Sequence, residues 1–141
     1  MSSPKILFMC VANSARSQLA EGLAKKLIPQ AEIQSAGSHP GKLNPYAVAV
    51  MKELDIDISR QFSKSTSDLD ANFLEKLDYV ITLCAEEVCP LIQTKAQKLH
   101  WPFPDPASKD PISDAEALNR FQIARESINA KIKTFKAEKR L

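Results

Sequence analysis

The chain contains no apolar run near the roughly 18 residues that a membrane-spanning helix needs. It has only 3 cysteines, an odd number that argues against a static disulfide framework. Aromatic residues make up 6%, and they do not alternate with basic residues as in many nucleic-acid-binding surfaces. The apolar run from Ile6 to Val11 is too short for the core of a secretory signal. These absences predict a cytoplasmic protein that binds neither nucleic acid nor membranes.

What is present indicates one soluble domain covering residues 1–141. Hydrophobic residues make up 44% of the chain, which is enough for a sizeable core. The 19 basic and 17 acidic residues leave a net charge of +2, too balanced for a protein that binds polyanions. No internal repeat or low-complexity segment interrupts the chain, and we expect a monomer.

Short apolar runs alternate with segments of helical periodicity, and this order is typical of an α/β fold. We therefore expect a small doubly wound, four-stranded parallel sheet with helices on both faces. The predicted strands are Lys5–Met9, Glu32–Ser35, Tyr79–Leu83 and Lys98–Trp101, and the predicted helices are Ser17–Leu27, Pro45–Leu54, Asp68–Leu77 and a long tail helix carrying Leu118, Phe121, Ile128, Ile132 and Phe135 on one face.

The segment between the first strand and the first helix has the spacing C-x5-R-S, from Cys10 to Ser17. A loop that enters a helix N-terminus points several backbone N–H groups at one spot, and the helix dipole adds positive charge. Arg16 can close this cradle around a tetrahedral oxyanion with a planar pair of donors. The same field favours a thiolate at Cys10, to which Ser17 can donate. The predicted oxyanion-binding residues are Val11, Ala12, Asn13, Ser14, Ala15, Arg16 and Ser17.

Cys84 directly follows the third predicted strand, as Cys10 follows the first. In a parallel sheet of this kind, ligands bind beyond the carboxyl ends of the strands. We therefore expect both cysteines at the same edge. Asp105 lies on a proline-rich loop that can hold its carboxylate over the cradle as a general acid.

The chain resembles the low-molecular-weight protein tyrosine phosphatases in C-x5-R-S and Asp105-Pro106. Further segments narrow the resemblance to the arsenate reductases built on the same fold. They are Arg16-Ser17-Gln18, Ala20-Glu21-Gly22, Ser35-Ala36-Gly37, Asn44-Pro45, Met51-Lys52-Glu53, Asp55-Ile56-Asp57-Ile58-Ser59, Thr82-Leu83-Cys84, Cys89-Pro90 and His100-Trp101.

This resemblance implies that Cys10 attacks arsenate and that Cys84 then attacks Cys10, releasing arsenite and leaving a Cys10–Cys84 disulfide. Cys89 next attacks Cys84 and frees Cys10. No tightly bound cofactor is implied. An external reductant resets the Cys84–Cys89 disulfide: thioredoxin in the best-known branch, glutathione with glutaredoxin in others. The gap between Cys84 and Cys89 is shorter than in typical thioredoxin-coupled members, so both reductants stay open.

Two rival functions remain at this point. A phosphatase acting on phosphotyrosine would need only Cys10, Arg16 and Asp105, although such enzymes usually follow Asp-Pro with an aromatic residue and Ala107 stands here. An oxyanion or redox sensor without turnover would need Cys10 but no ordered relay.

Some relatives hold a structural potassium ion near the loop, and the matching residues here are Asn13, Glu21, Ser35 and Asp68. A zinc site from Cys84, Cys89, His39 and His100 is a weaker alternative, because C-x4-C is poor spacing for zinc.

Overall fold

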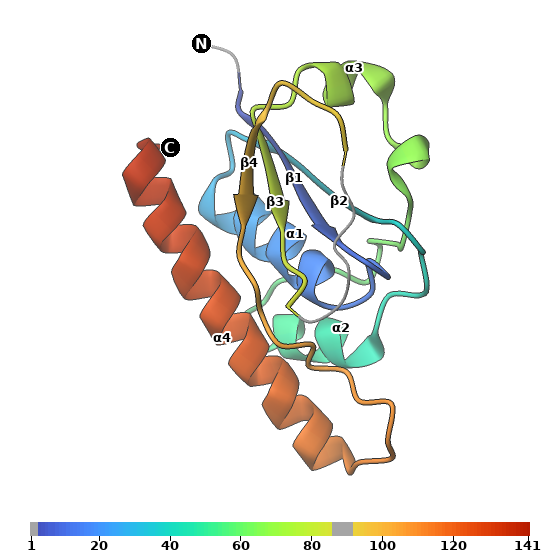
Figure 1. The fold of residues 1–141 in the computed structure, drawn as a ribbon. Coiled ribbons are helices and arrows are strands. Elements are labelled where there is room, and N and C mark those ends of the chain that lie inside the picture. Colours follow the sequence, from blue (N-terminus) through green and yellow to red (C-terminus); the bar gives the residue numbers. More distant parts are fainter. Residues whose placement is uncertain (1–2, 86–91) are drawn as a thin grey trace.

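The computed structural model describes residues 3–85 and 92–141. Four parallel strands form one sheet in the order β2-β1-β3-β4 (Figure 1). The strands are β1 (Lys5–Cys10), β2 (Glu32–Gly37), β3 (Tyr79–Thr82) and β4 (Gln97–His100). The predicted fold class is confirmed, with strand bounds within two residues of those expected.

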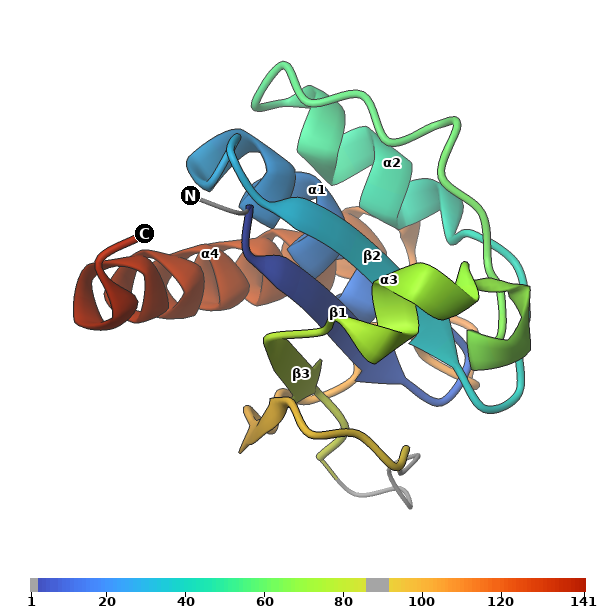
Figure 2. The same cartoon turned by 90° about the horizontal axis from the view of Figure 1, so that it is seen from above.

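Helices cover both faces of the sheet, as Figure 2 shows from above. The helices α1, α2 and α4 pack together on one face, and α3 covers the other. Their bounds are α1 (Arg16–Leu27), α2 (Pro45–Lys52), α3 (Ala71–Glu75) and α4 (Asp114–Lys139), with a 3-10 turn η1 (Thr66–Asp68) before α3.

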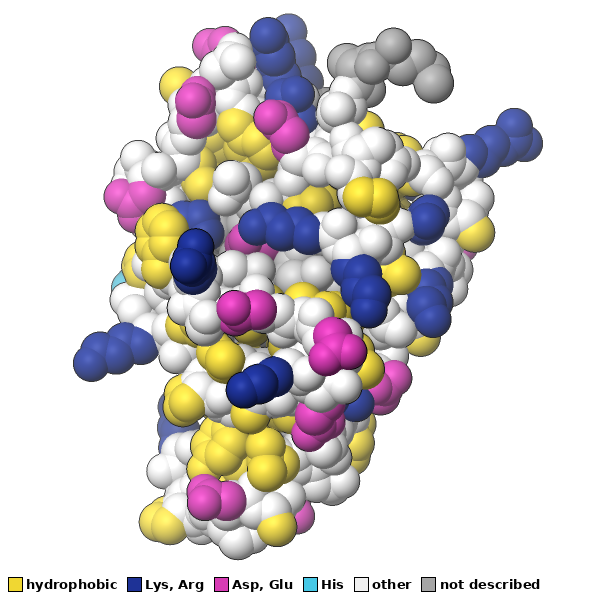
Figure 3. Space-filling view, turned by 180° about the vertical axis from the view of Figure 1, so that it is seen from behind, with side chains coloured by type: hydrophobic (Ala, Val, Ile, Leu, Met, Phe, Trp, Pro, Cys, Tyr) yellow, Lys and Arg dark blue, Asp and Glu magenta, His cyan; other side chains and the backbone are white. Residues whose placement is uncertain are grey.

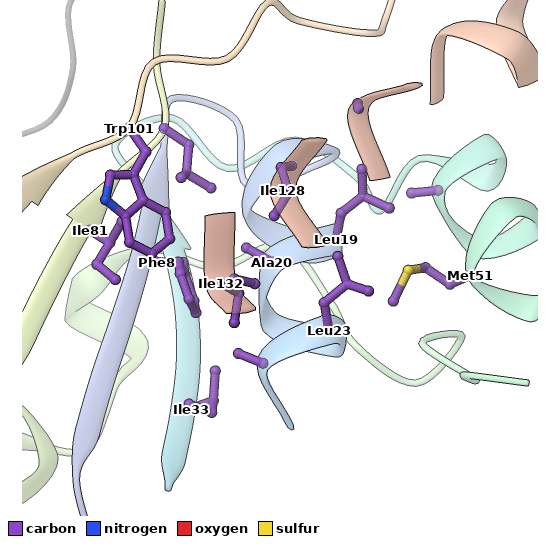
Figure 4. Close-up of a cluster of buried hydrophobic side chains, with 14 of the residues drawn as sticks. Phe8, Leu19, Ala20, Leu23, Ile33, Met51, Ile81, Trp101, Ile128 and Ile132 are labelled. Carbon is purple, nitrogen blue, oxygen red and sulfur yellow. The ribbon is translucent and has the colours of Figure 1, made fainter. Parts of the chain in front are cut away.

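The core consists of two layers separated by β1. Ile6 and Phe8 point toward α1 and α4, whereas Leu7 and Met9 point toward α3, because successive side chains of a strand alternate. The larger layer is drawn in Figure 4, where residues from α1 and α4 meet those of the sheet. Trp101 follows β4 in this layer and packs edge-on against Phe135 of α4, with ring centroids 5.4 Å apart.

Polar side chains cap the starts of α2 and α4. Asn44 accepts from the Tyr46 N–H at 2.8 Å, and Pro45 occupies the first position of α2, as expected. Ser113 accepts from the Glu116 N–H at 3.1 Å at the start of α4.

The prediction of a single helix over Asp68–Leu77 is wrong. Leu69 has extended backbone angles, and Asp70 caps a new, shorter helix by accepting from the Asn72 N–H at 2.7 Å. Asp70 therefore competes with the backbone and splits the segment, which is the usual effect of an aspartate near a helix start.

The face in Figure 3 carries Lys and Arg side chains interspersed with Asp and Glu, with apolar areas between them. Within residues 3–85 and 92–141, no helix is both long and apolar enough to cross a membrane.

Candidate active site

Cys10 ends β1 at the carboxyl edge of the sheet, and Arg16 begins α1 after a loop of five residues. Cys10 is a free thiol with 3% of its surface exposed. Its sulfur lies 2.8 Å from the hydroxyl oxygen of Ser17, in the first turn of α1. The predicted pairing of Cys10 with Ser17 is therefore present.

Every carbonyl from residue 11 to residue 14 accepts a hydrogen bond from outside the loop. Because a peptide unit is planar and trans, the N–H groups of the same units turn to the opposite side. Such a run of aligned N–H groups forms an anion-binding nest. The donors to the carbonyls are the His39 N–H to Val11, the Gly41 N–H to Ala12, the Ser63 hydroxyl to Asn13 and the Asn44 N–H to Ser14, at 2.6–2.9 Å.

The buried side chain of Asn13 connects this loop to its surroundings. Its Oδ1 accepts from the Lys64 N–H at 3.0 Å, which fixes the orientation of the amide. Its Nδ2 then donates to Ser17 Oγ at 2.7 Å and to Ser35 Oγ at 3.0 Å. Asn13 also has a positive φ of 50°, a region in which asparagine is among the favoured residues. The Asn13 side chain therefore ties the loop to α1, to β2 and to the segment that contains Lys64.

The side chain of Arg16 joins three segments that are far apart in the sequence. Its Nη1 donates to the Phe103 carbonyl at 2.9 Å and to the Leu83 carbonyl at 3.5 Å. Its Nη2 lies 3.8 Å from Asp105 Oδ2, and that aspartate side chain is 49% exposed. The structure thus brings the predicted arginine and the predicted general acid together at the edge where Cys10 lies.

The strand register puts Cys84 and Cys10 at the same edge of the sheet. Met9 pairs with Thr82, and the Leu83 N–H donates to the Met9 carbonyl at 2.9 Å, so both cysteines follow neighbouring strand ends. Cys84 is 1% exposed and is disulfide-bonded. Cys89 lies outside the described residues, and its role stays a prediction.

Of the four residues expected to bind potassium, Asn13, Ser35 and Glu21 are joined by hydrogen bonds, and potassium binding stays a prediction. Asp68 is exposed, and its carboxylate accepts from the Ser65 N–H at 2.9 Å at the start of η1. The two oxygens of Glu21 already face ammonium groups, that of Lys64 at 3.7 Å and that of Lys25 at 2.6 Å. Within the described parts of the chain, no group of three or more His, Cys, Asp or Glu side chains could hold a metal ion. The ammonium of Lys64 lies beside the Glu21 carboxylate of this group.

Sequence reasoning missed Lys64 and Ser63, both in a polar segment interpreted only as a loop. Burial lowers the pKa of Lys64 below its usual value, and the nearby Glu21 charge opposes that shift. A lysine in a polar loop carries no sequence signal of burial, because most such lysines are solvated.

A buried thiol beneath an anion-binding loop, with an arginine and a carboxylate at the same sheet edge, defines a phosphatase-like protein. The sequence model of the low molecular weight phosphotyrosine protein phosphatase family matches residues 5–139. The chain belongs to this family.

Similar proteins within the family are named arsenate reductases. The one from Halalkalibacterium halodurans is 41% identical over 138 residues, covering 96% of both chains. The one from Brevibacillus brevis is 43% identical over 134 residues, covering 92% of both.

Solved structures give the same result. One described as an arsenate reductase in the phosphate binding state has a TM-score of 0.77 and 31% identity, and the match covers 96% of this chain and 98% of that one. A thioredoxin-dependent arsenate reductase of Corynebacterium glutamicum has a TM-score of 0.67 and 27% identity, and the match covers 96% of this chain and 63% of that one. The resemblance inferred from the motifs is confirmed.

Proposed function

We propose that this protein reduces arsenate to arsenite with three cysteines. The observation that carries the proposal is that Cys10 and Cys84 lie at the carboxyl ends of two neighbouring strands. A phosphatase needs only the first of these thiols, whereas a reductase needs a second thiol within reach of the first. The names of the similar proteins support the same reaction.

In the first step, the N–H groups of the loop from Val11 to Ser17 and the Arg16 guanidinium hold the arsenate oxygens. The Cys10 thiolate attacks arsenic, so an S–As bond forms and one As–O bond breaks. The departing oxygen leaves as water after gaining a proton, for which Asp105 is the donor. Ser17 accepts from Asn13, which leaves its own proton free to donate to the Cys10 sulfur.

In the second step, which requires that the disulfide at Cys84 has first been reduced, the Cys84 thiolate attacks the sulfur of Cys10. An S–S bond forms, the S–As bond breaks, and its electron pair stays on arsenic, which leaves as arsenite. The two thiols have lost two electrons and As(V) has gained them. Arg16 donates to the carbonyl of Leu83, the residue before Cys84. The side chain that would bind the anion therefore also contacts the segment that contains the attacking cysteine.

The burial of both cysteines explains why the proposed mechanism uses a third cysteine. Cys10 and Cys84 are 3% and 1% exposed, so a protein reductant cannot reach a disulfide between them. Attack by Cys89 on Cys84 would free Cys10 and transfer the oxidised pair to Cys84 and Cys89. We propose thioredoxin as the external dithiol that attacks at Cys89, with glutathione and glutaredoxin as the alternative; the neighbouring structure described as thioredoxin-dependent supports the first.

The test is arsenite production from arsenate with each reductant system, for the wild type and for Cys10→Ser, Cys84→Ser and Cys89→Ser. We expect turnover only in the wild type and only with thioredoxin. Mass spectrometry after one turnover adds the order of events. Cys84→Ser should keep arsenic on Cys10, and Cys89→Ser should accumulate the Cys10–Cys84 disulfide.

Other outcomes each favour a different function. Turnover with glutathione and glutaredoxin that survives Cys89→Ser indicates a relay of two cysteines. Hydrolysis of a phosphotyrosine peptide that needs Cys10 and Asp105 but not Cys84, without any arsenite, indicates a phosphatase. Binding of arsenate without any product indicates a sensor.

A further inference from the structure

Lys64 has the surroundings of a bound monovalent cation. Its ammonium is 3.7 Å from Glu21 Oε1 and 3.5 Å from the Phe62 carbonyl, and it lies over the Phe62 ring, 4.9 Å from the centroid. Carboxylate oxygens, carbonyl oxygens and aromatic faces are the groups that attract an unhydrated cation. The Lys64 side chain is 6% exposed and that of Glu21 is 3% exposed, so this pair has lost most of its hydration.

A second cation cannot share this position at low cost. Like charges a few ångströms apart repel strongly where water is largely excluded. Glu21 is a single negative charge, and it already faces Lys64 on one oxygen and Lys25 on the other. The negative charge that would attract a potassium ion is therefore compensated by the chain itself.

Hydrogen bonds connect Lys64 to the reactive thiol. The Lys64 ammonium faces Glu21 Oε1 at 3.7 Å, and the backbone N–H of the same residue donates to Asn13 Oδ1. The Asn13 amide group must therefore donate to both Ser17 and Ser35. The Ser35 hydroxyl then has its proton free for Glu21 Oε1, at 2.5 Å. The Ser17 hydroxyl likewise has its proton free for Cys10, at 2.8 Å. Each donor direction in this network follows from the one before it.

We infer that the Lys64 ammonium is the permanent cation of this loop: it neutralises Glu21, the carboxylate at the far end of the hydrogen-bond network that reaches Cys10. The protein therefore needs no bound alkali cation. Lys64 is a positioning residue, because its ammonium acts on Cys10 through Glu21 and this network and does not contact the reacting atoms.

The first test compares reduced wild-type protein in potassium, sodium and choline buffers of equal ionic strength. The two measurements are the melting temperature and the rate at which iodoacetamide alkylates Cys10, followed by mass spectrometry of the peptide that contains it. We expect both to be the same in the three buffers. Neither measurement requires arsenate reduction, so a failure here is distinguishable from a failure of the proposed reductase activity.

The second test removes the ammonium. Lys64→Ala keeps the backbone N–H that donates to Asn13 but breaks the buried pair between the ammonium and Glu21. In choline buffer its Cys10 should alkylate more than about twofold more slowly than in the wild type, because the variant leaves a buried charge uncompensated. Potassium or methylammonium should restore much of the rate, because the shortened side chain leaves room for a small cation. Lys64→Met, which keeps the volume, should stay slow in every buffer.

Lys25→Ala is the matched control. It removes the other lysine that faces Glu21, and the Lys25 side chain is 50% exposed whereas that of Lys64 is 6% exposed. Its Cys10 alkylation rate should stay within about twofold of wild type, because an exposed ion pair contributes little. The inference is overturned if potassium raises either measurement in the wild type, if Lys64→Ala reacts as fast as wild type, or if Lys25→Ala slows as much. If Lys64→Ala does not fold, the comparison of buffers for the wild type and the alkylation rate of Lys64→Met test the inference.

Discussion

Gly37, the last residue of β2, offers a direct test of how tightly the anion-binding loop is packed. A Cβ at this position would approach the Val11 carbonyl oxygen and lie 2.9 Å from both the Asn13 nitrogen and the Cys10 carbonyl oxygen. All three are backbone atoms of the predicted active-site loop. They cannot move away by rotating a side chain, so Gly37→Ala must displace the loop itself.

The size of the effect follows from what can move. Overpacking a well-packed site costs about 1–3 kcal/mol, and rigid backbone neighbours place Gly37→Ala near 3 kcal/mol. For a domain of this size, that is a fall in melting temperature of roughly 6–12 °C. Gly22 in α1 is the matched control: a Cβ there would meet two side-chain atoms and no backbone, Ile58 Cγ2 at 2.7 Å and Met51 Cε at 2.8 Å. The flexible Met51 side chain can repack, whereas the stiffer Ile58 must shift. Alanine gains about 0.5–1 kcal/mol over glycine within a helix, which offsets part of that cost.

The assay combines thermal unfolding with protection of Cys10 from alkylation by inorganic phosphate. We expect Gly22→Ala to melt within about 3 °C of wild type and to keep full phosphate protection. Gly37→Ala should lose stability as above. Its affinity for phosphate should fall more than about tenfold, because the displaced loop misplaces its N–H groups, and a tenfold fall corresponds to about 1.4 kcal/mol of binding free energy. A Gly37→Ala protein with wild-type melting and wild-type phosphate protection would refute this account of the loop.

Three further predictions concern the scaffold. Ser113→Ala removes the cap on the Glu116 N–H and should cost about 1 kcal/mol of unfolding free energy without changing activity, as measured by urea unfolding and arsenite production. Ile132→Ala, at a fully buried position of α4, should cost about 2–5 kcal/mol in the same unfolding experiment; a loss below 1 kcal/mol would contradict the packing described. The hydrogen bond from Arg125 lowers the pKa of Glu53 below its ordinary 4.5. The stability that the Glu53 carboxylate contributes is therefore present above about pH 4.5, and it is lost as the pH falls through the lower pKa of Glu53 in the folded state. Glu53→Gln should be less stable than wild type at neutral pH, and the difference should disappear as the pH falls through the lowered pKa of Glu53 in the folded state.

The sequence alone was sufficient to predict the residues of the site that lie in one continuous segment of the chain. Cys10, Arg16 and Ser17 belong to one strand–loop–helix segment, and the apolar run before it and the helical periodicity after it are local signals. The cap at Asn44 was equally local, since its partner lies two residues away. The same kind of reasoning failed over Asp68–Leu77, where a helical pattern and the capping preference of Asp70 conflict and the cap prevails.

Tertiary structure alone decided which distant polar groups meet. The sequence could place Cys84 at the end of a strand, but only the strand order puts that strand next to β1. It could not show that Arg16 reaches the Phe103 carbonyl, or that Lys64 and not Asp68 approaches Glu21. The physical reason is that helices and strands form through short-range hydrogen bonds and periodicity, which neighbouring residues encode. The partner of a buried charge depends on the path of every loop, and burial of the whole core sets that path.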